Sequence, residues 1–231
     1  MAENVLFLGA HLDDAVISSG GTIRYLVEAG CTVSVVCFGN GDEAFTRPDE
    51  QQDAVRRFKA DAVRAYEILG VSNFECLDVP DFAVGQNRST YRECIRAIRK
   101  YRPRVIFGHN WAEYFQHHEM ASTSRDAWYQ SGWECSADLG PSWQAKRYFH
   151  FEVLDVLKNP THLIDVSSTF HVKMKAWSQF ESAQEHLGSL ARQLETRAMF
   201  HGAKIGAEYA EAFQQSFYLP EKISNPEALL G

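Results

Sequence analysis

The sequence lacks the features that mark several large classes of protein. Its five cysteines are odd in number and widely scattered, and none belongs to a CxxC pair. This argues against a disulfide framework or a cysteine-rich metal site, and it is typical of reduced cysteines in a cytoplasmic protein. No window approaches the roughly 20 apolar residues of a membrane span. The opening MAENVLF also has no basic segment of the kind that begins a signal peptide.

Positive charge is scarce as well. Lysine and arginine total 23 against 30 acidic residues, which gives a net charge of −7. Because a nucleic-acid binder normally carries a basic excess or a basic stripe, we expect no nucleic-acid partner. No GxGxxG motif follows the first apolar run, which argues against a dinucleotide site.

The chain does have a regular alternation of short apolar runs and helical patterns. With 231 residues, 45% of them hydrophobic, it is long enough for one substantial core, and we expect a single domain over 1–231. The patterns predict strands at 5–9, 32–38, 73–79 and 104–108, with helices between them at 17–29, 49–69 and 91–101. This order predicts a Rossmann-like α/β fold, in which a mostly parallel sheet has helices on both faces.

The second half of the chain is less regular. A helix with a Trp-rich loop is expected over 121–140, strands over 148–157 and 163–166, and one long amphipathic helix over 170–200. The tail, residues 220–231, is expected to be loosely held.

The segments after the first and fourth predicted strands carry most of the side chains that can bind a metal. These are His11, Asp13, Asp14, His109, His117 and His118. Ligands of such sheets bind beyond the carboxyl ends of the strands. Two histidines and a carboxylate are a common ligand set for catalytic zinc, and a further carboxylate can act as general base. The alternatives stay open: the aspartates as helix caps, the first histidine as a hydrogen-bonded structural residue, and the histidine pair as solvated.

Several stretches resemble one known family, the LmbE-like (PIG-L-like) zinc-dependent N-acetyl-amino-sugar deacetylases. AHLDDAVISSGGTI, starting at residue 10, is similar to the opening AHPDDE/AHPDDA signature. The stretch GHNWAEYFQHHEMAS stands where the family has its H-x-D-H motif. ILGVSNFECLDVPD, DVSSTFHVKMKAWSQFESAQ and GAKIGAEYAEAF resemble later family blocks, so the likeness covers about residues 4–213.

The resemblance implies roles for the residues that match the family motifs. His11 and Asp14 would bind zinc, with His118, the last histidine of the second motif, as the third ligand. Asp13 would be the general base that activates the metal-bound water. Iron or another divalent ion in place of zinc is left open.

The second motif departs from the family pattern. Its first histidine, which would stabilise the oxyanion or protonate the leaving amine, is Phe115 here, and its aspartate is His117. We expect His117, His109 or Tyr114 to take over this role, or Asp13 to serve as both base and acid.

Four residues are candidates for contacting the substrate. Asp81 falls where the family often has a substrate-contacting aspartate, with a turn residue after Pro80 as the alternative. Asn40 is a candidate for the mouth of the site, against the alternative of a plain turn. His109 and Tyr114 are the other two.

The sequence therefore predicts a zinc-dependent hydrolase that removes an acetyl group from an N-acetylated amino sugar or its conjugate. The expected partner is this small molecule, with no nucleic acid and no membrane, and a homo-oligomer is left open. The alternative is a metal- or sugar-binding protein of the same fold with impaired catalysis, favoured by Phe115 and His117. A nucleotide-binding Rossmann-like protein without zinc is the third reading.

Overall fold

The structure, a computed structural model, describes residues 3–217 apart from the side chains of residues 185 and 186. Its centre is a seven-stranded sheet of order β3-β2-β1-β4-β5-β7-β6. The strands are β1 (Asn4–Gly9), β2 (Thr32–Gly39), β3 (Asn73–Val79), β4 (Val105–His109), β5 (Arg147–Phe151), β6 (His162–Asp165) and β7 (Ala210–Ser216). Strands β1 to β5 pair in parallel, whereas β7 runs antiparallel to both of its neighbours. The expected α/β fold with a mostly parallel sheet is confirmed.

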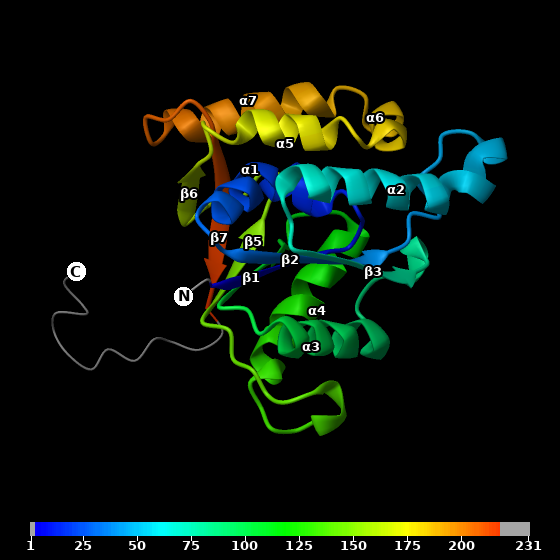
Figure 1. Ribbon diagram of the computed structural model, residues 1–231, viewed down its shortest axis with the longest axis vertical. Helices are drawn as coiled ribbons and strands as arrows, with labels where there is room; N and C mark the ends of the chain where they lie inside the picture. Colours follow the sequence, from blue (N-terminus) through cyan, green and yellow to red (C-terminus); the bar gives the residue numbers. More distant parts are fainter. Residues whose placement is uncertain (1–2, 218–231) are drawn as a thin grey trace, which may run out of the picture.

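Helices cover both faces of this sheet (Figure 1). On one face lie α1 (Asp14–Glu28) and α2 (Gln51–Leu69), and on the other lie α3 (Arg88–Tyr101) and α4 (Phe115–Ser131). An outer layer lies over this face and is formed by α5 (Phe170–Trp177), α6 (Glu181–Leu187) and α7 (Leu190–Ala203). Helix α5 packs on α1 and α2, α6 packs on α2, and α7 packs on β6 and β7.

The central strands β1 and β2 are buried on both faces, and their sequences are accordingly apolar almost throughout. In β1, Val5 and Phe7 belong to the core under α1 and α2, while Leu6 and Leu8 belong to the core on the side of α3 and α4. Successive side chains of a strand point to opposite faces, so a continuous apolar run supplies both cores.

Four expectations about the elements were wrong in detail. The strand expected over 148–157 ends at Phe151. Helix α4 begins at Phe115 rather than at 121. The helix expected over 170–200 is three helices, and Gly188, at the end of α6, has a φ of 49° that an unbroken helix does not allow. Strand β7 was not anticipated, because its sequence AEAFQQS has no β-branched residue. The expectation for the tail 220–231 lies outside the described residues.

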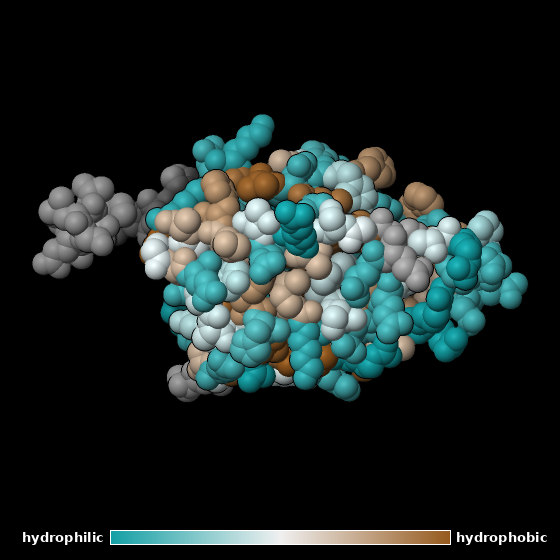
Figure 2. All heavy atoms as spheres, turned by 90° about the horizontal axis from the view of Figure 1, so that it is seen from above, coloured by the Kyte–Doolittle hydropathy of each residue, from teal (hydrophilic) through white to brown (hydrophobic). Residues whose placement is uncertain are grey.

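The outer face formed by α5 to α7 has no large continuous hydrophobic area in the view of Figure 2. Figure 2 looks onto the side of α5–α7, where hydrophobic residues occur in small groups among hydrophilic ones. Within residues 3–217, no helix has the length and apolar character needed to cross a bilayer.

The strand order places one crevice at the centre of the sheet. Strand β1 lies between β2 and β4, and the helices that follow β1 and β4 cover opposite faces. The order of strands reverses there, which is where open α/β sheets bind their ligands. The segments after β1 and β4 are those that carry the predicted site residues.

Candidate metal centre

The turn after β1 brings the carboxylate of Asp14 back over the strand end. Its Oδ2 accepts a hydrogen bond from the backbone N–H of His11 at 2.6 Å. Asp13 precedes the first residue of α1, yet its side chain makes no capping hydrogen bond there. The cap alternative therefore fails for Asp13, whose side chain lines a cavity instead.

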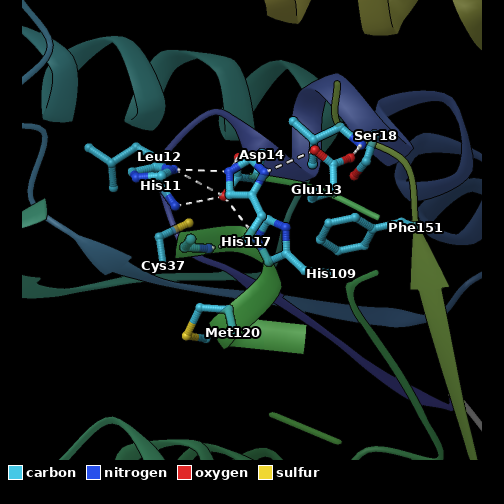
Figure 3. A network of polar contacts seen from close by, with 12 residues as sticks. His11, Leu12, Asp14, Ser18, Cys37, His109, Glu113, His117, Met120 and Phe151 are labelled. Carbon is cyan, nitrogen blue, oxygen red and sulfur yellow. Dashed lines mark hydrogen bonds and ion pairs between the residues drawn. The ribbon is translucent and has the colours of Figure 1, made fainter. Parts of the chain in front are cut away.

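The segment after β4 brings a second histidine onto the same carboxylate. Helix α4 starts at Phe115, and in its first turn the His117 ring faces the sheet. Its Nε2 lies 3.1 Å from Asp14 Oδ1 and 3.1 Å from His11 Nδ1. Figure 3 shows the rings of His11, His109 and His117 gathered around Asp14.

The structure places His117, rather than the expected third ligand His118, beside Asp14. His118 is exposed, and its Nδ1 donates to the carbonyl oxygen of Trp111 at 2.9 Å. Successive residues of a helix point about 100° apart, so only one of the two neighbouring histidines can face the sheet. That histidine is His117, which is 2% exposed.

The position of His117 changes how the family's second motif aligns with this sequence, by one residue. With His117 as its last histidine, the pattern H-x-D-H falls on Tyr114, Phe115, Gln116 and His117. Tyr114 then stands in place of the first histidine, and its hydroxyl lies 3.3 Å from His11 Nδ1. Phe115 points away from the site, with 69% of its surface exposed.

The atoms of this cluster fit a divalent metal ion. One atom each of His11, Asp14 and His117 lie within 4.8 Å of one another. Two imidazole nitrogens and a carboxylate are a metal-ligand set, and a cation between them would relieve the crowding of their lone pairs. Among the described residues this is the group that meets that test.

Glu113 lies directly behind His117, and the sequence alone did not point to it. Its Oε2 is 3.4 Å from His117 Nδ1, and its side chain is fully buried. The other oxygen, Oε1, accepts hydrogen bonds from the backbone N–H groups of Val153, Leu154 and Asp155. A carboxylate on Nδ1 holds the proton there and leaves the Nε2 lone pair free for the cluster. The i, i+4 spacing of Glu113 and His117 was the available signal.

The buried carboxylates and histidines of the site change one another's pKa values. Burial alone would raise the pKa of Asp14, but the neighbouring His117 and His109 outweigh it and hold this pKa well below 3.8. For His117, burial works to lower the pKa, and Asp14 and Glu113 overcome it and raise the pKa to about 9. Burial, and then the charge of Asp14, raise the pKa of Asp13 to about 7. Two adjacent carboxylates thus differ widely in basicity.

His109 supports the cluster from the protein side. It is fully buried, and its Nε2 accepts from the backbone N–H of Ala10 at 2.9 Å and lies 3.1 Å from Asp14 Oδ2. Burial lowers the pKa of His109 to about 4, so its ring is neutral. Because it does not reach the cavity lined by the described residues, the expected contact with substrate is not supported.

A cavity of about 250 Å³ opens onto the cluster. Its lining includes Asp13, Tyr114 and Asp81 besides the three cluster residues. The Asp81 carboxylate accepts the backbone N–H groups of Gly41 and Glu43, so it holds the loop after β2 as well as lining the cavity. Asn40 is not part of the described lining, and its side-chain oxygen accepts from the N–H of Asp42, as in a plain turn.

Fold and site together define an α/β protein with a candidate metal centre at the switch point of its sheet. The chain belongs to the PIG-L family, described as GlcNAc-PI de-N-acetylase, whose family model matches residues 6–128. It is 29% identical over 227 residues to a diacetylchitobiose deacetylase of Thermococcus kodakarensis, covering 92% of this chain and 82% of the relative.

Solved structures share the fold over nearly the whole chain. The N,N'-diacetylchitobiose deacetylase of Pyrococcus horikoshii superposes with a TM-score of 0.85 at 22% identity, covering 96% of this chain and 88% of the other. A 4-carboxy-2-hydroxymuconate hydratase of Pseudomonas putida reaches a TM-score of 0.80 at 21% identity, covering 96% and 100%. Because a hydratase has the same fold, the fold alone does not decide the reaction.

Proposed function

We propose that this protein is a metal-dependent deacetylase that hydrolyses the acetamido group of an N-acetylated amino sugar or its conjugate. The observation that carries the proposal is the convergence of His11, Asp14 and His117 on the wall of a cavity, with Asp13 beside them. Membership of the PIG-L family and the diacetylchitobiose deacetylase relative support the choice of reaction and of a sugar substrate.

The metal would be held by His11, Asp14 and His117, with Glu113 and His109 as the supporting partners. Zinc is our choice among divalent ions, because two imidazoles and one carboxylate with an open position are typical of catalytic zinc. When bound, such an ion polarises the acetyl carbonyl and acidifies a water molecule.

Asp13 is the proposed general base. Its carboxyl group lines the cavity, and its pKa of about 7, raised mainly by burial, suits a group that must exchange a proton near neutral pH. Asp13 takes the proton from the attacking water and passes it to the sugar nitrogen as the C–N bond breaks. The products are acetate and a free amine.

Tyr114 is the proposed donor to the carbonyl oxygen. Its hydroxyl stands at the edge of the cluster, 3.3 Å from His11 Nδ1, and its ring lines the cavity. Burial and the nearby carboxylates raise the pKa of Tyr114 above 10, so the phenol keeps its proton and can donate it in a hydrogen bond. Tyr114 would thus take over the role of the family's first histidine, whose place in the shifted motif it occupies.

The test is acetate release by the zinc-loaded protein from a panel of N-acetylated sugars, compared with Asp13→Asn. We expect turnover by the wild type and a large loss in the variant, with the metal content of both equal. Metal binding without acetate release from any sugar would favour the alternative, a binding protein with impaired catalysis. We also propose a cytoplasmic location, which the five free cysteines support.

A further inference from the structure

The cavity is small for a whole sugar conjugate. Ligand cavities usually measure about 300 to 1,000 Å³, whereas this one is about 250 Å³. It therefore takes the acetamido group with one sugar ring at most. Whatever else the substrate carries must lie at the mouth.

The mouth carries exposed apolar side chains from separate segments. Phe82, from the turn after β3, is 80% exposed, and Leu154, from the segment after β5, is 45% exposed, and both line the cavity. Single exposed apolar residues are ordinary, but two that line the same opening from different loops offer apolar surface to whatever lies there. Further in, Ile17, Phe58 and Leu187 extend the apolar lining from α1, α2 and α6.

Away from the metal cluster, two of the polar side chains of the lining, Asp81 and Gln116, are engaged within the protein, while Glu43 is exposed at the edge. Both oxygens of Asp81 accept backbone N–H groups, and Gln116 donates its side-chain amide to the carbonyl oxygen of Asp81 at 3.1 Å. A second sugar ring at the mouth would bring several hydroxyl groups to an edge where Glu43 is the main free acceptor beside Phe82 and Leu154. Desolvating unpaired hydroxyl groups costs binding energy, whereas an apolar group gains it.

From these observations we infer that the substrate is an N-acetylated amino sugar whose aglycone is apolar, an alkyl or aryl glycoside rather than a free sugar or an oligosaccharide. The inference rests on the proposed function, because loss of acetyl as the small product leaves the amine side of the substrate at the mouth. Phe82 and Leu154 are the residues that would contact the aglycone.

The experiment compares kcat/KM of the zinc-loaded enzyme for three substrates: N-acetylglucosamine, N,N'-diacetylchitobiose and hexyl N-acetyl-β-glucosaminide. We expect the hexyl glycoside to exceed both others by about tenfold, which corresponds to about 1.4 kcal/mol. In Phe82→Asn and Leu154→Asn the ratio of hexyl glycoside to free sugar should fall toward one. The matched control is Phe200→Asn on α7, an exposed phenyl outside the lining, which should keep the wild-type ratio.

Equal or faster hydrolysis of the disaccharide would overturn the inference and leave the deacetylase function standing. Faster hydrolysis of N-hexanoylglucosamine than of the hexyl glycoside would also overturn it, since the apolar edge would then serve the acyl side. Failure to release acetate from any substrate by a metal-loaded enzyme would instead count against the proposed function itself.

Discussion

Two buried glutamate–histidine pairs lie beside the segment that follows β5, and only one of them belongs to the candidate metal centre. Glu113 Oε2 is 3.4 Å from His117 Nδ1, and Glu152 Oε2 is 3.0 Å from His201 Nε2. Both glutamates also accept backbone N–H groups of residues 153–157 through their other oxygen. By composition and burial the two pairs are nearly the same.

The difference lies at the second nitrogen of each ring. His117 Nε2 meets Asp14 and His11 at 3.1 Å, whereas the buried Nδ1 of His201 has no hydrogen-bond partner among the described residues. The Glu152 pair lies beside the guanidinium group of Arg197, whereas the Glu113 pair lies beside the Asp14 carboxylate and the His11 ring. A buried carboxylate–histidine pair thus becomes a candidate metal site only where a second set of donors converges on the free ring nitrogen.

The sharpest way to break this comparison is to remove each histidine. His117→Ala should lose the bound metal, and with it several kcal/mol of transition-state stabilisation, about 10³-fold or more in rate. His201→Ala and His118→Ala should keep about one metal ion per chain. Elemental analysis of the purified variants measures this. If His118→Ala lost the metal and His117→Ala kept it, His118 would be the third ligand after all.

Asp13→Asn separates the base from the ligands. We expect kcat to fall by about 10²- to 10⁴-fold, because proton transfer by a positioned side chain contributes that much. Metal content should stay at the wild-type level, since Asp13 is not among the three clustered atoms. Activity within a few-fold of wild type would remove Asp13 from the mechanism.

Glu113→Gln and Glu152→Gln compare the two pairs directly. Both changes keep an oxygen for the backbone N–H groups and remove the charge. Glu113→Gln should weaken metal binding by about 10- to 100-fold, the usual effect of losing a carboxylate behind a ligating histidine. Glu152→Gln should leave metal affinity unchanged, and chelator competition measures both. If both variants lost metal affinity equally, Glu113 would act by holding the loop after β5 rather than by orienting His117.

Metal binding should also displace a proton from His117. In the metal-free protein the pKa of His117 is about 9, raised by Asp14 and Glu113 against the effect of burial, so near pH 8 the ring is mostly protonated. A metal needs the neutral ring, so affinity should rise by about tenfold per pH unit there and level off above about pH 9. Calorimetry in two buffers of different ionisation enthalpy should find about one proton released. Release of none would contradict either the raised pKa of His117 or its role as a ligand, and the metal content of His117→Ala separates the two.

The sequence was sufficient for the first four strands of the sheet and for one half of the candidate site. Short apolar runs with helical patterns between them determined the order β1 to β4, and the AHLDD turn identified His11, Asp13 and Asp14. Strand β7 escaped because its pairing with β5 comes from tertiary packing rather than from its own residues. The choice between His117 and His118 depends on the rotational phase of α4, which adjacent histidines in a sequence do not reveal.

Because Glu113 is bonded on both sides, it links the candidate metal ligand His117 to the loop that lines the cavity. One carboxylate holds the His117 ring and also the backbone of Val153–Asp155, while Val153 and Leu154 line the cavity. A graft of another loop after β5, made to change which sugars are accepted, would pull on the histidine as well. The loop after β5 therefore cannot be changed without also disturbing the candidate metal site. The turn that carries Phe82 is the better place to alter which substrates are accepted.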